Sequence, residues 1–467
     1  MIRLLLASMS SGSGKTVLTC AFLEALRRRG YKIQAFKCGP DYIDPQFHRM
    51  IDGVKSRNLD LFLADLNQDK LKLIYAEAIE KSGADAVICE GVMGYYDGLG
   101  GVTAQGSAWD TARILRLPAL LIVNAKANSL TLAAQIRGLR DFRENNNIIG
   151  IFLNSCSRDL YKILSPVLER ETGLPVLGYL PRMKEAEFKS RHLGLNPPDE
   201  DNNKNNILNR FGALALKLEE CADLDRLFKL CEDNNMNINL ENIAPDYDLN
   251  NINNKINKIK IAVARDAALN LIYPENLEIL KKFGAEIVFI SLLRDKNLPD
   301  DIGGLYLPGG YPECHAKELY ENLAMREDIL KIIQNGLPVV AEGGGFLYLG
   351  QEIKNQDGES YRMTGILPGK AFPVGRPVRF GYAYMTAREN SLLFRVGDRV
   401  PVHAFHYWDS TENGSDFEFQ KPISKRTWRG GFANANLYAA FSRLYFPGRP
   451  EIAERFVQAA KKYKNIK

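Results

Sequence analysis

The stretch that most constrains the fold is LLLASMSSGSGKTVLTCAFLEALRRRG, which runs from Leu4 to Gly30. An apolar strand, a Ser/Gly loop and an amphipathic helix follow one another, which predicts a phosphate-binding P-loop. Backbone N–H groups and the helix N-terminus would hold phosphates, Lys15 would reach their outer oxygens, and Thr16 would hold Mg²⁺. The strict pattern is broken at Met9, and the alternative is a tight turn that holds no phosphate. The predicted ATP-binding loop residues are Gly12, Ser13, Gly14, Lys15 and Thr16.

The rest of the chain repeats this strand–helix alternation twice. Up to about residue 195, apolar runs such as KIQAF, DAVICE and PALLIVNA alternate with helical patterns, and after residue 258 the alternation restarts with IKIAVA and EIVFI. This pattern predicts an α/β protein with a parallel-sheet P-loop domain followed by a second α/β domain. We expect domains at 1–195 and 259–450, a linker with connecting helices at 196–258, and a C-terminal helix at 451–467.

Composition excludes several other classes of protein. The 467 residues are 45% hydrophobic and 25% charged, and no apolar run is long enough to span a membrane. The formal charge of +5 includes no long basic run, so the chain is not expected to bind nucleic acid or a membrane. Seven cysteines without C-x-x-C spacing predict buried thiols, and the N-terminus lacks a signal-peptide pattern, which predicts a cytoplasmic protein.

Two further segments place acidic residues near the expected phosphate site. DAVICEGVMGYYDG ends an apolar strand at Glu90, a Mg²⁺ candidate, and continues to Asp97. FKCGPDYIDPQFH carries Asp41 and Asp44 in what we expect to be a Pro/Gly-rich loop at the same sheet edge, where open α/β sheets bind ligands. The alternatives are a solvated strand-end acid at Glu90, and an Asx-type turn and helix cap at the two aspartates.

PVVAEGGGFLYLG, from Pro338 to Gly350, has the pattern of a strand-to-helix elbow. The apex of such an elbow normally carries a Ser or Cys nucleophile beside free N–H donors. Here the apex is Gly343, so this segment is either a plain glycine turn or a nucleophile site that has lost its nucleophile.

Several long motifs resemble the cobyrinic acid a,c-diamide synthase family. They occur in the family's order and extend over nearly the whole chain: FKCGPDYIDPQFH, SRNLD, EGVMGYYDG, RHLGL, YPENLEIL and GGYPE. The resemblance implies a dethiobiotin-synthetase-like ATP domain and a class I glutamine-amidotransferase-like domain. It further implies ATP- and Mg²⁺-dependent amidation of the a and c side-chain carboxylates of a corrinoid during cobalamin biosynthesis.

The resemblance also assigns roles to individual residues. Those implied in catalysis and substrate activation are Lys15, Asp41, Asp44, Asp97 and His406. Those implied in Mg²⁺ binding are Thr16, Asp44 and Glu90. Asn154 is assigned to the adenine edge, although the family tends to have Arg where Ser155 stands here. The candidate contacts for the substrate are Tyr42, Arg57, Arg191 and His192. The last three could instead form surface salt bridges.

The second half departs from the family at the positions that release ammonia from glutamine. The family elbow is A-E-C-G-G, and Gly343 replaces its cysteine. In VHAFHYW, His403 and His406 are present but Ala404 replaces a family glutamate. FSRLYF aligns with a family strand that carries two histidines at the positions of Arg443 and Tyr445. Changes in three segments favour natural loss of glutaminase activity over an engineered inactivation.

We therefore expect a ligase that forms C–N bonds on cobyrinic acid, with ammonia or glutamine as nitrogen donor. The same chemistry on sirohaem, nickel sirohydrochlorin or hydrogenobyrinic acid is an alternative. Two alternatives of another class are a P-loop switch ATPase and a non-catalytic tetrapyrrole-binding homologue. A homodimer or an external glutaminase would be a further partner.

Overall fold

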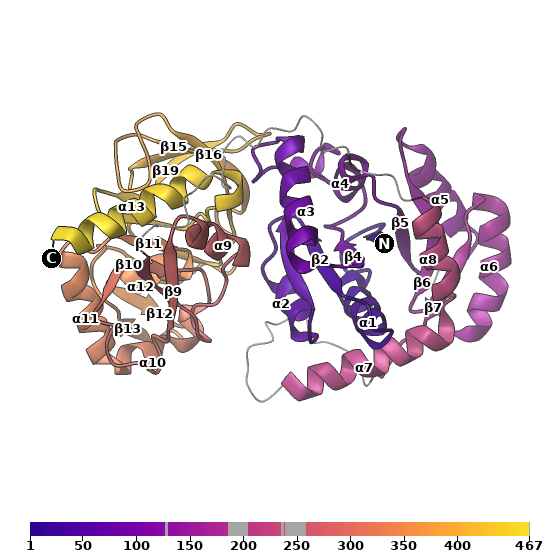
Figure 1. Cartoon of the computed structure of the whole chain (residues 1–467), viewed down its shortest axis with the longest axis horizontal. Helices are drawn as coiled ribbons and strands as arrows, with labels where there is room; N and C mark the ends of the chain where they lie inside the picture. Colours follow the sequence, from indigo (N-terminus) through magenta and orange to yellow (C-terminus); the bar gives the residue numbers. More distant parts are fainter. Residues whose placement is uncertain (127–128, 185–203, 235–237, 239–257, 467) are drawn as a thin grey trace. The chain divides into compact units, whose positions relative to one another are not determined.

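The computed structural model describes residues 1–126, 129–184, 204–234, 238 and 258–466. The chain divides into two compact units, one formed by Met1–Leu61 and Leu66–Ala244 and the other by Phe62–Asp65 and Pro245–Lys467 (Figure 1). Each unit is described by itself. The predicted domain limits at 195, 258 and 450 stay predictions.

The first unit is built on a seven-stranded parallel sheet. Its strand order is β3-β2-β4-β1-β5-β6-β7. The strands are β1 (Ile2–Ser8), β2 (Ile33–Cys38), β3 (Lys55–Leu59), β4 (Ala86–Glu90), β5 (Ala119–Asn124), β6 (Ile148–Asn154) and β7 (Val176–Leu180). Every strand except β3 forms from an apolar run of the sequence. The expected parallel-sheet domain is confirmed.

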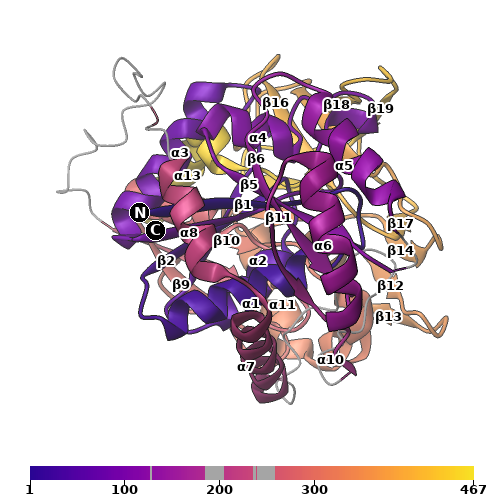
Figure 2. The same cartoon turned by 90° about the vertical axis from the view of Figure 1, so that its right-hand side faces the viewer.

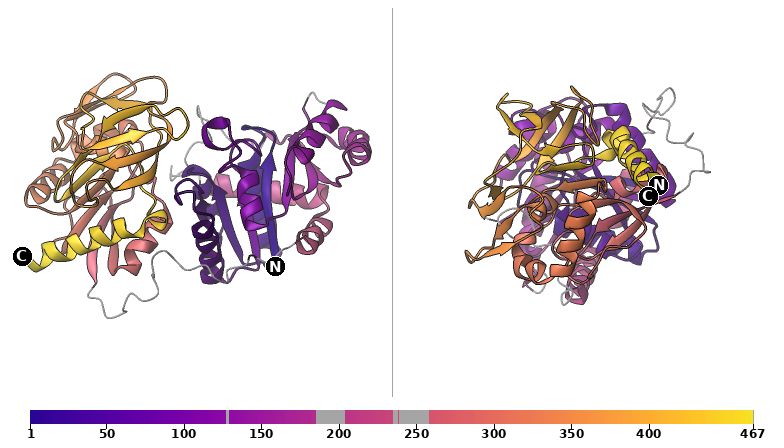
Figure 3. Two further views of the ribbon diagram at one scale, coloured as in Figure 1. Left: turned by 90° about the horizontal axis from the view of Figure 1, so that it is seen from above. Right: turned by 90° about the vertical axis from the view of Figure 1, so that its left-hand side faces the viewer.

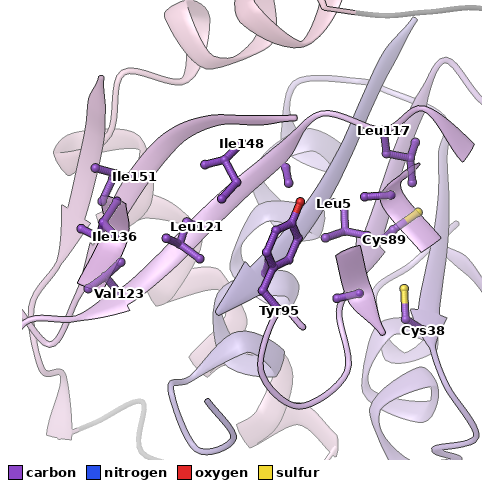
Figure 4. Close-up of a cluster of buried hydrophobic side chains, with 14 of the residues drawn as sticks. Leu5, Cys38, Cys89, Tyr95, Leu117, Leu121, Val123, Ile136, Ile148 and Ile151 are labelled. Carbon is purple, nitrogen blue, oxygen red and sulfur yellow. The ribbon is translucent and has the colours of Figure 1, made fainter. Parts of the chain in front are cut away.

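Helices cover both faces of this sheet, as a parallel sheet requires. The helices are α1 (Lys15–Arg28), α2 (Ile43–Met50), α3 (Gln68–Ser82), α4 (Ala108–Leu115), α5 (Thr131–Asp141) and α6 (Arg158–Thr172). In Figure 2, α1 lies on one side of the strands and α3 and α4 on the other. The core on the latter side joins Leu5, Cys89 and Leu121 of the sheet to Ile136 of α5 (Figure 4). On the opposite face the rings of Phe22 and Phe152 meet edge to face, 5.9 Å apart.

The segment expected to connect the domains forms two helices, α7 (Lys204–Cys221) and α8 (Leu224–Asp233). Both belong to the first unit. Phe211 and Leu227 are buried, and Arg29 at the end of α1 bonds to Glu219 and Asp225 at 2.5 and 2.6 Å. These helices therefore complete the cover of the first sheet.

The second unit is built on a six-stranded sheet in the order β20-β21-β11-β10-β8-β9, parallel except for its edge strand β20. Its strands are β8 (Ile259–Ala264), β9 (Ala285–Ile290), β10 (Ile302–Leu307), β11 (Val339–Glu342), β20 (Phe432–Ala433) and β21 (Leu437–Ala440). Around it lie the helices α9 (Pro274–Lys282), α10 (Ala316–Glu321), α11 (Leu323–Gln334), α12 (Gly344–Leu349) and α13 (Pro450–Ile466). Figure 3 shows α13, in yellow, along this unit, and Phe456 on α13 packs in the core with Val263 and Tyr306.

Two smaller sheets in this unit have no counterpart in the sequence prediction. Their orders are β13-β12-β14-β17 and β16-β15-β18-β19. Their strands are β12 (Glu352–Lys354), β13 (Ser360–Arg362), β14 (Lys370–Pro373), β15 (Gly381–Ala387), β16 (Arg399–Ala404), β17 (Trp408–Ser410), β18 (Phe417–Gln420) and β19 (Thr427–Gly430). Six of the seven cysteines are buried thiols, as expected, whereas Cys314 is exposed. Across the described residues, no helix combines the length and apolar character needed to cross a bilayer.

Candidate active site

The loop between β1 and α1 has the backbone of a phosphate-binding loop. Gly12 and Gly14 adopt φ of 75° and 85°, in the left-handed region that favours glycine. The Ser13 hydroxyl donates to the Ser10 carbonyl at 2.9 Å, which fixes the turn. The loop therefore directs the start of α1, with its unbonded N–H groups, toward the carboxyl edge of the sheet.

Lys15 folds back over this loop. Its ammonium group donates to Ser8 Oγ at 2.7 Å and to the carbonyl oxygens of Met93 and Ser10 at 2.5 and 3.3 Å. Burial lowers the pKa of Lys15 to about 8, and the positive charge of Lys37 acts in the same direction. An anion beside Lys15 would raise this pKa again, because it stabilises the charged ammonium. The site therefore favours a negatively charged ligand.

Glu90 lies at the centre of the site and is fully buried. Its Oε1 accepts hydrogen bonds from Thr16 Oγ1 at 2.7 Å and from Lys37 Nζ at 2.8 Å. Its Oε2 lies 2.8 Å from His48 Nε2. Although burial opposes the charged form, Lys37 and His48 hold the pKa of Glu90 well below its usual range. The predicted association of Glu90 with the P-loop threonine is present, whereas the solvated-acid alternative does not fit a buried carboxylate.

Asp44 and Glu90 share one cation, because Lys37 Nζ also lies 2.6 Å from Asp44 Oδ2. Burial raises the pKa of Asp44 and the nearby charge of Asp41 adds to this effect, while Lys37 opposes both. The two carboxylates flank a place where positive charge is strongly favoured. The Thr16 hydroxyl and these carboxylates form an oxygen donor set of the kind that Mg²⁺ takes, with nucleotide phosphates and water completing its shell.

The expected loop around Asp44 is wrong. Residues Ile43–Met50 form α2, so Asp44 and His48 lie one helical turn apart. Asp41 Oδ1 accepts from the backbone N–H groups of Ile43 and Asp44 at 2.7 and 3.3 Å, which caps the helix as the alternative interpretation proposed. Pro45 is compatible with this helix because it lies in the first turn, where an N–H has no partner to lose.

The other predicted residues lie in several places. Asp97 follows β4, and its Oδ2 accepts from the Gly94 N–H at 2.9 Å. Asn154 ends β6, and its Nδ2 donates to the Ser13 carbonyl at 2.8 Å, so it supports the phosphate loop. Tyr42 precedes α2 and Arg57 lies in β3, both buried. The remaining two substrate candidates, Arg191 and His192, lie outside the described residues.

Sequence reasoning gave no role to the residues that surround Glu90. Lys37, His48 and Ser56 were visible in the quoted motifs, but an apolar or charge pattern does not show which of them face a common acid. The signal that could have found one of them is the spacing of four between Asp44 and His48, which places both on one face of a helix.

Comparisons with known proteins identify the family. Residues 4–195 match the CobQ/CobB/MinD/ParA nucleotide binding domain, and residues 260–428 match the CobB/CobQ-like glutamine amidotransferase domain. The cobyrinate a,c-diamide synthases of Priestia megaterium and Clostridium acetobutylicum are 34% and 37% identical to the chain. The matches cover 98% and 97% of this chain and 97% and 99% of the relatives. The chain belongs to the cobyrinate a,c-diamide synthase family. The enzyme of Picrophilus torridus is 36% identical over 98% of both chains.

In the amidotransferase-like unit of this family member, the elbow keeps its backbone shape. Gly343 joins β11 to α12 with φ of 51° and ψ of −106°. Glu342 before it is buried, accepting from the Leu444 N–H at 2.8 Å and the Tyr306 hydroxyl at 3.0 Å. Burial raises the pKa of Glu342 to about 7. The elbow is thus built like a nucleophile turn but presents no side chain at its apex.

Arg443 lies beside this apex and is buried. A Cβ added at Gly343 would lie 3.6 Å from Arg443 Nε and 3.5 Å from Gly309 Cα. A guanidinium therefore lies next to the apex of the elbow, the position at which the resemblance expects a nucleophile. The FSRLYF segment expected as a strand lies beyond β21, which ends at Ala440, although Arg443 forms one isolated bridge to His403.

The two histidines of VHAFHYW are also buried. His406 Nδ1 lies 2.5 Å from the Trp408 carbonyl, which can only accept, so the proton is on Nδ1 and Nε2 is an acceptor. The ring stacks on Phe441 with 3.8 Å between centroids. Burial lowers the pKa of His406 to about 4 and that of His403 to about 3. Ala404, at the end of β16, offers neither histidine a carboxylate.

Proposed function

We propose that the chain is an ATP-dependent ligase that amidates the a and c side-chain carboxylates of cobyrinic acid. The observation that carries the proposal is the buried cluster of Lys15, Thr16, Lys37, Asp44 and Glu90 at one sheet edge, in a chain that matches cobyrinate a,c-diamide synthases over nearly its full length. The cluster supports the proposal because it supplies a lysine for the phosphates together with a hydroxyl and two carboxylates of the kind that bind Mg²⁺.

Two steps follow from the chemistry of the substrate, because a carboxylate resists attack by ammonia until it is activated. In the first step, a carboxylate oxygen of the substrate attacks the γ-phosphorus of ATP, which gives an acyl phosphate and ADP. In the second, the nitrogen of ammonia attacks the acyl carbon, the C–O bond to phosphate breaks, and a proton leaves the nitrogen as the amide forms. Repeating both steps at the second carboxylate consumes a second ATP.

Each residue of the site has a part in these two steps. The N–H groups of the loop and the Lys15 ammonium bind the phosphates. Thr16, Asp44 and Glu90 would hold Mg²⁺, which offsets charge on the transferring group when bound. Asp41 and Asp97 surround the reacting carboxylate, Tyr42 and Arg57 contact the substrate, and Asn154 keeps the loop in shape close to the adenine. These roles are assigned by position in the family motifs.

The nitrogen donor is ammonia rather than glutamine. Gly343 carries no thiol to attack the glutamine amide, and the Arg443 guanidinium lies next to the place such a thiol would occupy. Loss of the glutaminase half leaves amidation dependent on free ammonia or on ammonia from another protein, such as an external glutaminase.

A phosphate-release assay with cobyrinic acid tests the function. We expect ATP-dependent phosphate release and diamide product with ammonium chloride, and neither with glutamine in ammonia-free buffer. The matched control is Lys15→Gln, which should retain the fold and lose phosphate release. Absence of substrate-dependent phosphate release with cobyrinic acid, sirohaem, nickel sirohydrochlorin and hydrogenobyrinic acid alike would refute the ligase assignment, and equal rates from glutamine would refute the loss of glutaminase activity.

A further inference from the structure

A buried chain of hydrogen bonds leads away from the candidate metal site through α2 to β3. Ser56 Oγ lies 3.0 Å from His48 Nδ1, and His48 Nε2 lies 2.8 Å from Glu90 Oε2. The exposed fractions of the three residues are 2%, 0% and 0%. The sequence predicted no role for His48 or Ser56. Burying their polar groups costs free energy, which the packing of an apolar core does not require.

The direction of the hydrogen bonds follows from their partners. The Glu90 carboxylate can only accept, so His48 donates from Nε2. The Nδ1 of the neutral ring then accepts from the Ser56 hydroxyl. Both ring nitrogens are satisfied in one arrangement, which fixes the orientation of the ring and of the carboxylate that it holds.

The two oxygens of Glu90 are thereby given different surroundings. Among the described residues, the contact of Oε2 is His48, whereas Oε1 takes the Thr16 hydroxyl and the Lys37 ammonium. Oε1 is the oxygen that faces the P-loop and the cation place beside Asp44. Without the N–H of His48, the plane of the carboxylate could rotate, and no oxygen would be held toward the P-loop threonine.

We propose that His48, held by Ser56, is a positioning residue that fixes the plane of the Glu90 carboxylate, so that one of its oxygens stays directed toward the P-loop threonine, where a divalent cation would bind. The inference rests on the proposed function, because it needs a divalent cation at Glu90. His48 does not touch nucleotide or metal in this role, and its effect reaches the metal only through Glu90.

The coupling between metal and nucleotide binding tests this role. Calorimetry measures the Kd of AMP-PNP with Mn²⁺ and in EDTA. The readout is the Kd in EDTA divided by the Kd with Mn²⁺. For His48→Leu, which fills similar space without a donor, we expect the ratio to fall about 10-fold or more, as is usual when a residue supporting a metal ligand is lost. Metal-free affinity should stay within about twofold of wild type.

Two further variants separate positioning from packing. His48→Gln keeps an N–H donor and should retain the ratio within about threefold, while Ser56→Ala should fall between wild type and His48→Leu. If His48→Leu does not fold, these two decide alone, since a packing role predicts an unchanged ratio in Ser56→Ala.

Glu90→Gln distinguishes failure of this inference from failure of the proposed function. If the ratio falls in Glu90→Gln but stays at the wild-type value in His48→Leu, the positioning role is overturned and the metal site stands. A wild-type ratio in Glu90→Gln removes the metal from Glu90 and overturns the positioning role, while the ligase assignment is decided by the phosphate-release assay. If the ratio falls as far in His48→Gln as in His48→Leu, the role is also overturned, because an N–H donor at this position would not restore the coupling.

Discussion

Gly14→Ala should weaken the first unit through one identifiable collision. Gly14 has φ of 85° at the start of α1, and a Cβ built there would lie closer than 3.0 Å to Asn154 Nδ2. Alanine in this backbone region costs about 1–2 kcal/mol. Displacing Asn154 also breaks its hydrogen bond to the Ser13 carbonyl and overpacks the loop, which adds about 1–3 kcal/mol.

The chain supplies a matched control for the backbone term. Gly30 has φ of 86°, and a Cβ there would meet nothing within 4 Å. Gly30→Ala should therefore cost only the backbone strain, and Gly14→Ala should exceed it by about 1–3 kcal/mol. Placing Gly14→Ala in an Asn154→Ala background removes the collision, so the cost should fall to that of Gly30→Ala.

Urea unfolding followed by tryptophan fluorescence measures these differences. The chain has three tryptophans, of which Trp109 lies in the first unit and Trp408 and Trp428 in the second. A background with the latter two changed to Phe reports the first unit alone, which avoids treating two units as one transition. Equal costs for the Gly14 and Gly30 variants, or an unchanged Gly14→Ala cost in the Asn154→Ala background, would refute the contact between Asn154 and the loop.

Three further changes have expected outcomes. The pKa of Glu342 is raised from 4.5 to about 7, so its contribution to stability is complete below about pH 4.5 and is lost as the pH rises to 7. Glu342→Gln should thus change the difference in unfolding free energy from wild type by about 3 kcal/mol across that window, measured with Trp109→Phe, and a pH-independent difference would contradict the shift. Gly343→Cys should fold, since its Cβ meets only contacts of 3.5 Å or more, and should react with iodoacetamide without gaining glutaminase activity. Glutamine turnover in this variant would show that a guanidinium beside the thiol does not prevent glutamine hydrolysis. Asp41→Ala should cost about 1 kcal/mol as a lost helix cap, whereas Asp41→Asn should keep stability but lose activity if the charge is catalytic, and equal stability losses in both would contradict the cap.

Much of the fold could be predicted because the parallel strands are buried on both faces. Runs such as Ile2–Ser8 and Ala119–Asn124 are almost wholly apolar, and each is bounded by turn or helix signals. Six of the eight strands in the small sheets of the second unit have only three or four residues, such as Glu352–Lys354, in which alternation is too short to detect. α2 was missed because its proline and the preceding glycine favour a loop, and only the cap at Asp41 makes the helix evident.

The candidate site was predictable as a set of residues and not as a network. The P-loop spacing and the strand-end acid placed Lys15, Thr16 and Glu90 at one edge, because parallel strands end together. Spacing does not show that Lys37 bridges Asp44 and Glu90, or that His48 takes the other oxygen of Glu90. Those contacts depend on how α2 packs against β2 and β3.

The backbone of the elbow explains why glycine is well accommodated at its apex. A residue with a side chain at φ of 51° and ψ of −106° stores strain of about 1–3 kcal/mol, which a nucleophile site sustains because function requires it. Glycine adopts the same backbone without that strain, so Gly343 is accommodated at the apex, and its N–H donates to the Ala440 carbonyl at 2.9 Å. Once the thiol is absent, nothing requires a base opposite it, and a guanidinium can take the adjacent position. A glycine at the apex and a guanidinium beside it are therefore compatible with each other, and a cysteine introduced at position 343 would lie next to a cation.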